Sequence, residues 1–314
     1  MKAEILDMLS QSEEPVSGER LSTALDVSRV AVWKHIRQLQ ESGYDIQASP
    51  KGYRLYSAPD TPFPWAFGPL AERLHYYPEV TSTMDKAMEL AQSGCPAFTV
   101  VVAERQSKGR GRLSRTWQSS AGGLYFTLVL RPDISPEKSP LLNLAAAVDL
   151  STAIENLYGI HCGLKWPNDL LVDERKLAGI LSVMSAESDR VEFVNIGIGV
   201  NVHNDTRKVQ PPAVSISRLT KLRVSRTDIL KAFWERFERR LCQQQLDRVI
   251  DEWRQKTITL GRWVKVQTIH DTIEGRAVDL EETGALILET DDGQRKTVVY
   301  GDCFHQGHAR GQNN

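Results

Sequence analysis

The spacing of apolar residues changes twice along this chain and divides it into three regions. Residues 1–58 show helical spacing followed by a short hairpin pattern, and residues 66–261 mix long helical patterns with buried strands. Residues 262–314 contain only short alternating strands separated by HD, EETG and DDG turns, typical of a small SH3-like β-barrel. We therefore predict an α+β protein of three domains with these boundaries, built on a central mixed β-sheet with flanking helices.

The first region has the element order of a winged helix-turn-helix. Ile5, Leu6 and Leu9 predict a first amphipathic helix. Ser17 is expected to cap a second, although Arg20 stands where a capping box has Glu or Gln. A third helix is expected in SRVAVWKHIRQLQESG, where the helically spaced positions are Val30, Trp33, Ile36, Leu39 and Gln40. YDIQASPKGYRL then predicts two short strands about a PKG turn, which completes the order of that module.

Positive charge in this region is concentrated on the third helix and the hairpin. Residues 1–27 hold two basic and six acidic residues, a net charge of −4, whereas residues 28–54 hold five basic and two acidic residues, a net charge of +3. That distribution is expected for phosphate contacts. The candidate DNA-binding residues are Ser28, Arg29, Val30, Ala31, Trp33, Lys34, Arg37 and Lys51. A helical oligomerisation or protein-binding domain is the alternative.

SAPDTPFPWAFGP, with four prolines, is interpreted as a semi-rigid linker. The net charge of the chain is −1, so any binding of a polyanion must come from local patches. Its four cysteines form no CxxC pair, which argues against a disulfide framework or zinc site and favours a reducing compartment. The N-terminus does not read as a signal peptide, and no apolar run approaches the ~18–20 residues that span a bilayer. We expect a cytoplasmic protein without membrane contact.

The loop SKGRGRLSRTW contains four cations and no acid, so we expect it to stay loose until an anion binds. A dinucleotide fingerprint fails, because Ser114 replaces the third glycine and no helix pattern follows, and there is no Walker motif. A nucleic-acid patch is less favoured, because only Trp117 offers a stacking ring. We favour a loop that closes over a small anionic ligand. Its glycines would let the backbone approach the ligand closely, and its arginines would bind phosphate or carboxylate through paired hydrogen bonds. A solvated basic loop is the default alternative.

Two later segments favour the small ligand. Lys165 stands between Leu164 and Trp166 at the end of a buried strand, where an ammonium group costs free energy unless it meets a charge. Lys176 precedes a glycine-containing strand, and NIGIGVNV ends in Asn201. Each has an ordinary explanation, such as a lysine whose tip reaches solvent or glycines that permit close packing. Together they indicate a phosphate-handling pocket at the ends of strands.

In that order, GRGRLSRTW, KWPNDL, KLAGIL and IGIGVNV resemble the biotin protein ligases. The preceding SRVAVWKHIRQL is similar to the bifunctional members that also repress the biotin operon, so the resemblance covers essentially the whole chain. It implies a class II synthetase-like biotin/lipoate ligase fold. It also implies that biotin and ATP, with Mg²⁺, form biotinyl-5′-AMP, whose biotin passes to a lysine of the biotin carboxyl carrier protein of acetyl-CoA carboxylase. Operator DNA and a ligand-promoted homodimer are implied partners.

The resemblance also implies which residues meet the ligands. We expect Lys165, Arg110 and Arg112 to be catalytic. The expected biotin and adenylate contacts are Ser82, Thr83, Met84, Gln106, Gly109, Arg110, Gly111, Arg112, Trp117, Lys165, Lys176, Gly179 and Asn201. Met84 departs from the family, since many members have Asn after Ser-Thr, and no metal ligand is assigned. A ligand-sensing transcription factor without turnover and a lipoate or octanoate ligase are the alternatives.

Overall fold

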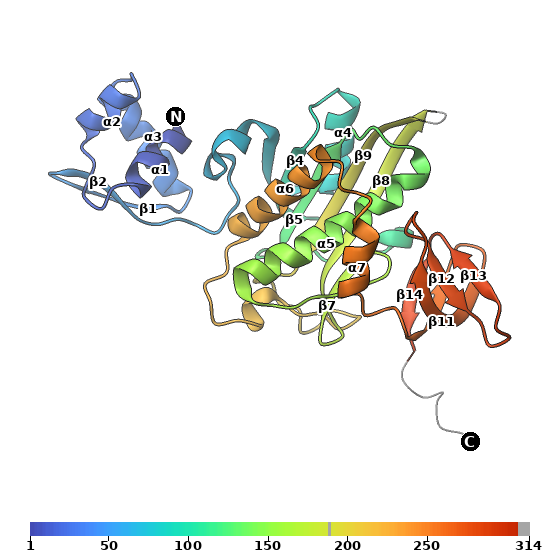
Figure 1. Cartoon of the computed structure of the whole chain (residues 1–314). Coiled ribbons are helices and arrows are strands. Elements are labelled where there is room, and N and C mark those ends of the chain that lie inside the picture. Colours follow the sequence, from blue (N-terminus) through green and yellow to red (C-terminus); the bar gives the residue numbers. More distant parts are fainter. Residues whose placement is uncertain (188–189, 307–314) are drawn as a thin grey trace. The chain divides into compact units, whose positions relative to one another are not determined.

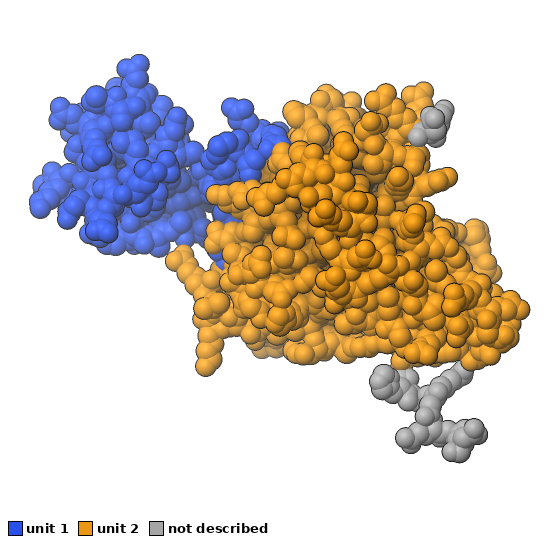
Figure 2. All heavy atoms as spheres, in the orientation of Figure 1, with its two compact units in different colours: residues 1–76, 225–227 blue, residues 77–224, 228–314 orange. Residues whose placement is uncertain are grey.

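The computed structural model describes residues 1–187 and 190–306, and of Ser114 the backbone alone. The chain forms two compact units, which are coloured separately in Figure 2. Unit 1 contains residues 1–76 and 225–227, and unit 2 contains residues 77–224 and everything from 228 onward. The predicted boundaries at 58, 66 and 261 remain predictions, because these units divide the chain elsewhere.

Unit 1 has the predicted order of helices and hairpin. Its elements are α1 (Lys2–Ser10), α2 (Gly18–Ala24), α3 (Arg29–Glu41), β1 (Asp45–Ser49) and β2 (Gly52–Ser57). Ser17 caps α2 by accepting a hydrogen bond from Arg20 N, and Ser28 caps α3 by accepting one from Ala31 N. Each cap ends the preceding turn at a defined residue, and β1 and β2 pair antiparallel as the wing.

The helically spaced positions of α3 divide between a buried and an exposed face. Val32, Ile36 and Leu39 enter the core, whereas Val30 and Trp33 are exposed. The first three follow the i, i+4, i+7 spacing of a single stripe that faces α1 and α2. Val30 and Trp33 also have helical spacing, but on a neighbouring stripe, so periodicity alone did not distinguish the two faces.

The proline-rich segment is not the semi-rigid linker expected from its composition. It forms two 3₁₀ turns, Pro64–Ala66 and Gly68–Arg73, and packs on the helical core of unit 1. Trp65 stacks on Phe63 at 4.6 Å and donates a hydrogen bond to the Tyr44 hydroxyl at 3.1 Å. Phe67 is buried. Aromatic side chains between the prolines bury enough apolar surface to hold the segment in place.

Unit 2 is built on a seven-stranded sheet. Its strand order is β3 (Leu74–Val80), β4 (Thr99–Gln106), β5 (Leu124–Leu130), β9 (Arg190–Val200), β8 (Arg175–Glu187), β7 (Asp169–Val172) and β6 (Gly163–Lys165). Neighbours from β4 to β6 are antiparallel, and isolated parallel bridges such as Lys176 with Ala213 make the sheet mixed at its margins.

Helices cover both faces of this sheet (Figure 1). Phe126 of β5 contacts Phe233 of α6 (Arg226–Cys242), so α6 covers one face. The next residue, Thr127, points to the other face and donates a hydrogen bond to Thr83 at the start of α4 (Thr83–Gln92). Helices α5 (Ser139–Tyr158) and α7 (Val249–Lys256) complete the unit's helical layer. No helix in the described part of the chain is long and apolar enough to cross a membrane.

The C-terminal strands form a second sheet in unit 2. They are β10 (Trp263–Gln267), β11 (Thr272–Leu280), β12 (Leu286–Glu289), β13 (Arg295–Val298) and β14 (Asp302–His305), and they pair antiparallel in the order β13-β12-β11-β10-β14. The described pairings leave β13 and β14 as edges, so the sheet is consistent with the expected barrel but is not closed. Trp166 donates its indole hydrogen to Gly284 O at 3.0 Å and so joins the two sheets.

A buried ion-pair network joins three helices. Asp149 of α5 is fully buried and accepts hydrogen bonds from Arg236 at 2.7 Å and from two nitrogens of Arg240 at 2.8 Å. Arg240 in turn pairs with Glu252 of α7. Because both acids meet the same buried guanidinium, the three helices are held at one spacing.

We expect Asp149→Ala to lower the free energy of unfolding by about 3–5 kcal/mol, because it leaves Arg240 buried beside a cavity with only Glu252 as an acidic partner. Urea unfolding measures this change. Asp251→Ala is the matched control, since Asp251 pairs with Arg254 in solvent and should contribute no more than about 1 kcal/mol. Similar losses for both variants would contradict the assignment.

Candidate functional site

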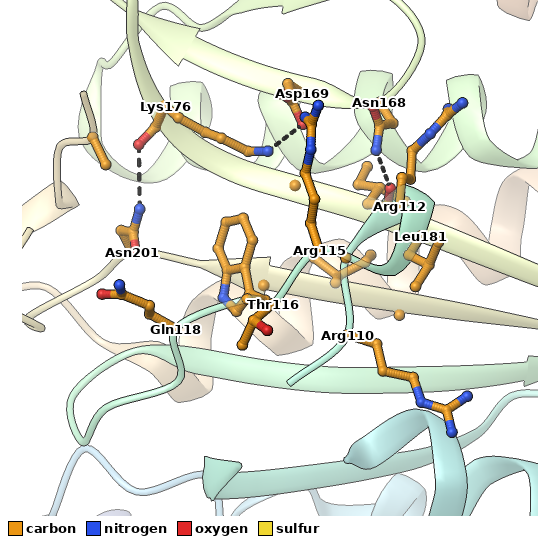
Figure 3. A pocket seen from close by; sticks show the side chains of 18 of the residues that line it. Arg110, Arg112, Arg115, Thr116, Gln118, Asn168, Asp169, Lys176, Leu181 and Asn201 are labelled. Atoms are coloured by element: carbon orange, nitrogen blue, oxygen red, sulfur yellow. Dashed lines mark hydrogen bonds and ion pairs between the residues drawn. The ribbon is translucent and has the colours of Figure 1, made fainter. Parts of the chain in front are cut away.

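A pocket of about 300 Å³ lies where α4, the cationic loop, β6 to β9 and β14 meet (Figure 3). Of the thirteen residues predicted to contact ligand, all but Gly109 line it. Gly109 lies behind the lining, where a Cβ would come 2.3 Å from Trp117 O, so its role is to let the loop fold back.

The floor of the pocket is formed by three glycines at positions whose side chains would project from the α4 face of the sheet. A Cβ on Gly199 would lie 2.4 Å from the indole of Trp117, and one on Gly179 would lie 2.8 Å from the same ring. A Cβ on Gly197 would meet Met84 Sδ at 2.7 Å. The close packing considered for this glycine pattern is therefore confirmed, and it places Trp117 directly against the sheet.

The loop is held as a narrow turn by its own backbone. Trp117 N donates to Gly109 O at 2.9 Å, and Gly111 N donates to Arg115 O at 2.7 Å. These bonds place Arg110, Arg112 and Arg115 around the mouth of the pocket.

Acids from distant segments meet the loop's arginines, although the loop itself contains none. Arg110 pairs with Asp85 of α4 at 2.5 Å, and Arg115 pairs with Asp302 of β14 at 2.6 Å. Arg112 donates to Gly301 O at 3.1 Å and lies 3.9 Å from Asp302. Burial lowers the pKa of Arg112, and the carboxylate of Asp302 counters that effect. Local composition missed these acids because they are far away in sequence.

Lys165 is the exception among the pocket's cations. It is half-buried at the end of β6 and lines the pocket, yet across residues 1–187 and 190–306 its ammonium group makes no hydrogen bond or ion pair. Its ammonium group lies 6.0 Å from the Phe304 ring. The Glu174 carboxylate acts on this ammonium group only from beyond ion-pair distance and is itself paired with Arg262, so the group is available to an anionic ligand.

Lys176 and Asn201 lie side by side in the pocket and are joined by a hydrogen bond (Figure 3). Lys176 pairs with Asp169 at 2.7 Å and lies 5.2 Å from the Trp117 ring. Asn201 donates to Lys176 O at 3.2 Å and accepts from Asn204 at 2.9 Å. Together they build a polar wall at the ends of β8 and β9.

A chain of hydrogen bonds forms the inner end of the pocket. Thr83 N donates to Gln106 Oε1 at 2.8 Å, and Gln106 Nε2 donates to Ser119 Oγ at 2.8 Å. Ser82 caps α4 by accepting from Met84 N at 3.3 Å. These groups hold fixed donors and acceptors beside the apolar Met84, which is 5% exposed.

The sequence missed several lining residues. Asn168 and Asp169 lay inside the KWPNDL motif and could have been chosen from it. Asp302, Cys303 and Phe304 come from β14, whose sequence has no recognisable motif, so nothing local indicated them.

Most of the candidate DNA-binding residues are exposed in unit 1. Ser28 caps α3 and Ala31 is half-buried, while the other six side chains are exposed; these are Arg29, Val30, Trp33, Lys34, Arg37 and Lys51. These six side chains, five on α3 and one at the wing turn, are therefore accessible to a partner from solvent.

His305 follows the pocket residues of β14 and makes the stability of the protein depend on pH. Its ring nitrogens contact Thr259 Oγ1 at 3.1 Å and Arg262 at 3.3 Å, and burial, with Lys165 and Arg262, lowers its pKa from 6.5 to about 4. The folded protein thus favours neutral histidine. This contribution to stability is complete above pH 6.5 and is lost as the pH falls through about 4.

We therefore expect the free energy of unfolding to fall between pH 6.5 and 4, with about one proton taken up on unfolding. His305→Asn should remove that proton from the pH dependence. Urea unfolding at pH 4.5 and 7.5 compares the two proteins, with exposed His270→Asn as the control. An unchanged pH slope in His305→Asn would refute the burial effect.

Comparison with known proteins agrees with this geometry. Profiles described as the biotin/lipoate A/B protein ligase family, an HTH domain and the biotin protein ligase C-terminal domain match residues 76–201, 2–54 and 259–306. The bifunctional ligase/repressor BirA of Bacillus subtilis is 36% identical over 312 residues, covering 94% of this chain and 96% of the relative. That of Escherichia coli is 30% identical, covering 88% of each.

A solved structure of the biotin protein ligase from Aquifex aeolicus in complex with biotin and ATP is also similar. It has a TM-score of 0.64 and 29% identity, and the match covers 74% of this chain and 98% of that one. Both the sequence and the architecture of the pocket unit thus agree with the biotin ligases, and the N-terminal unit agrees with their DNA-binding members. The chain belongs to the biotin protein ligase family, in its bifunctional ligase/repressor branch.

Proposed function

We propose that this protein activates biotin with ATP, transfers the biotin to a lysine of the biotin carboxyl carrier protein of acetyl-CoA carboxylase, and represses transcription when the activated vitamin is bound. The observation that carries the proposal is Lys165, a half-buried and unpaired cation facing a glycine-floored pocket whose mouth is lined by arginines.

The first step joins two anions, the biotin carboxylate and the α-phosphate of ATP. Their repulsion is the main obstacle, so a cation that contacts both in the transition state lowers the barrier. Lys165 is suited to this role because no carboxylate in the described chain forms an ion pair with its ammonium group. We assign it to bridge the attacking carboxylate oxygen and the α-phosphate as pyrophosphate leaves.

Arg110 and Arg112 are assigned to cover the mixed anhydride once it has formed. Arg110 already pairs with Asp85, and Arg112 already donates to Gly301 O. An anionic ligand would therefore replace these partners or be bound in addition to them. Each charge-assisted hydrogen bond that forms to the anhydride contributes about 1.5–3 kcal/mol to holding it in place. The covered anhydride is kept from water.

The remaining pocket residues are assigned to recognition. Trp117 and Met84 provide apolar surface over the glycine floor for the fused ring and the alkyl chain of biotin. Thr83 and Gln106 provide fixed polar groups at the inner end. Lys176 and Asn201, at the other wall, are assigned to the nucleotide.

We propose direct attack by the acceptor lysine, without a covalent enzyme intermediate. Cys303 is the thiol in the pocket lining, and burial raises its pKa to about 12, so it stays protonated at neutral pH. The carrier's amine therefore attacks the acyl carbon of the adenylate, and AMP leaves.

Mg²⁺ is proposed as the nucleotide's counter-ion. No group of three or more metal-ligating side chains occurs among the described residues, and the pocket carboxylates Asp169, Asp205 and Asp302 are paired with cations. This fits an ion that is held mainly by ATP phosphates and water, as Mg²⁺ commonly is. When bound it would neutralise the β- and γ-phosphates, while the chain's own cations act at the α-phosphate.

Repression is proposed to act through unit 1 on operator DNA. The +3 charge of residues 28–54 and the exposed basic side chains of α3 support phosphate contacts. We further propose that adenylate promotes dimerisation, which would pair two winged modules on a palindromic site, and that the protein acts in the cytoplasm.

One assay distinguishes this function from its two alternatives, and it also tests Lys165. ATP–pyrophosphate exchange should depend on biotin and not on lipoate or octanoate, and a sensor without turnover would give no exchange. Lys165→Ala should lower the biotin-dependent rate by roughly 100- to 1,000-fold. Exposed Lys138→Ala is the control and should leave the rate unchanged. Full exchange in Lys165→Ala would remove it from the mechanism.

Arg112→Gly tests the covering role. The variant should release adenylate roughly 10- to 100-fold faster, because charge-assisted bonds are lost, and should biotinylate exposed lysines of bystander proteins. Release of labelled adenylate and blotting for biotin measure both effects. Lys108→Gly removes a cation from the same loop outside the pocket and is the matched control. Equal lifetimes of the complex in Arg112→Gly and the native protein would contradict shielding.

A further inference from the structure

Unit 1 displays an apolar patch in the middle of its basic surface. Every residue of this unit is described, and its exposed large apolar side chains are Met1, Val30, Trp33 and Tyr56. Val30 is 62% exposed and Trp33 is 52% exposed. They lie one turn apart on α3, so both side chains occupy the same outer stripe.

This exposure is not required by the fold of α3. Its core contacts come from Val32, Ile36 and Leu39, which are essentially fully buried. Single exposed apolar side chains are common in proteins, but an adjacent Val and Trp near the N-terminus of a recognition helix leave a contiguous apolar surface in water. Such a surface indicates a partner with an apolar group to place there.

Cations surround the patch. Arg29, Lys34 and Arg37 are exposed on the same helix, and the Arg37 guanidinium lies 5.9 Å from the centre of the Trp33 ring. The partner must therefore combine anionic groups at its rim with apolar groups at its centre. The major groove of DNA has this arrangement, with phosphates along both edges and the C5-methyl groups of thymine on its floor.

We propose that Val30 and Trp33 make α3 selective for thymine by contacting C5-methyl groups, while Arg29, Lys34 and Arg37 hold the flanking phosphates. The side chain of valine has no polar atom, and indole offers one donor and no acceptor. In the major groove guanine presents two acceptors, cytosine one donor and adenine one of each. Valine can satisfy none of these groups and a single indole donor at most one, so the others would lose hydrogen bonds to water without replacement. This inference rests on the proposed repressor function and names the base that α3 would recognise in the operator.

The test uses the full-length protein with biotin, ATP and Mg²⁺. Duplexes are first selected from a random library, and each thymine of the selected site is then replaced by uracil. Uracil keeps the base-pairing and groove hydrogen-bonding groups and removes only the methyl group. We expect at least one position in each half-site where uracil weakens binding about fourfold per contacted methyl, at fixed salt.

Trp33→Ala and Val30→Ala locate the contact. Each should bind the thymine site more weakly and should lose the thymine–uracil difference at its own position, as a double-mutant cycle between protein and base requires. Both positions are exposed in a helix that alanine favours, so thermal unfolding should be unchanged. Lys34→Ala is the matched control, which should weaken binding to both bases equally and reduce the salt dependence by about one phosphate contact.

The outcomes separate this inference from the function on which it rests. Sequence-specific binding that no uracil substitution weakens would overturn the thymine contact and leave repression standing. Selection of no sequence would overturn both. A Trp33→Ala variant that alters sedimentation of the protein but keeps the thymine–uracil difference would assign the patch to a protein partner and refute the inference.

Discussion

The site depends on bare backbone at Gly179, Gly197 and Gly199. Because these residues have no Cβ, the Trp117 ring can lie against the sheet and Met84 can fill the space beside it. Trp117 anchors one end of the cationic loop, and its amide bonds to Gly109 O at the other end. The position of Arg110 and Arg112 at the pocket mouth therefore follows from the absence of side chains on β8 and β9.

Electrostatics decides how that pocket can act. Asp85 and Asp302 hold Arg110 and Arg115, so the loop already has an ordered geometry before an anion arrives. Lys165 has no such partner in the described chain. Arg110 and Arg115 must therefore exchange an acidic partner to bind a ligand, whereas Lys165 can bind one directly. A pocket of this kind concentrates positive potential at one point without making the whole protein basic, as the net charge of −1 shows.

Much of the fold and most of the pocket could be predicted, because the relevant signals are local. Hydrophobic spacing identified α1 and the wing, and short motifs identified Lys165, Lys176 and Asn201. What the sequence left open or missed has one cause. The apolar positions of α3 fall on two neighbouring stripes, and only packing against α1 and α2 decided that Val32, Ile36 and Leu39 are the buried ones. The prolines around Trp65 suggested a linker, whereas its aromatic contacts made it part of unit 1.

The sequence by itself determined the order of elements, the family motifs and the chemical character of the site, since each depends on residues that are neighbours along the chain. Tertiary structure alone decided that Asp302 and Phe304 of β14 complete the pocket and that Asp85 meets Arg110. Those pairs lie far apart in sequence, and no local preference selects one distant acid over another. Their meeting is set by how two sheets and a helix pack, which is a property of the folded core.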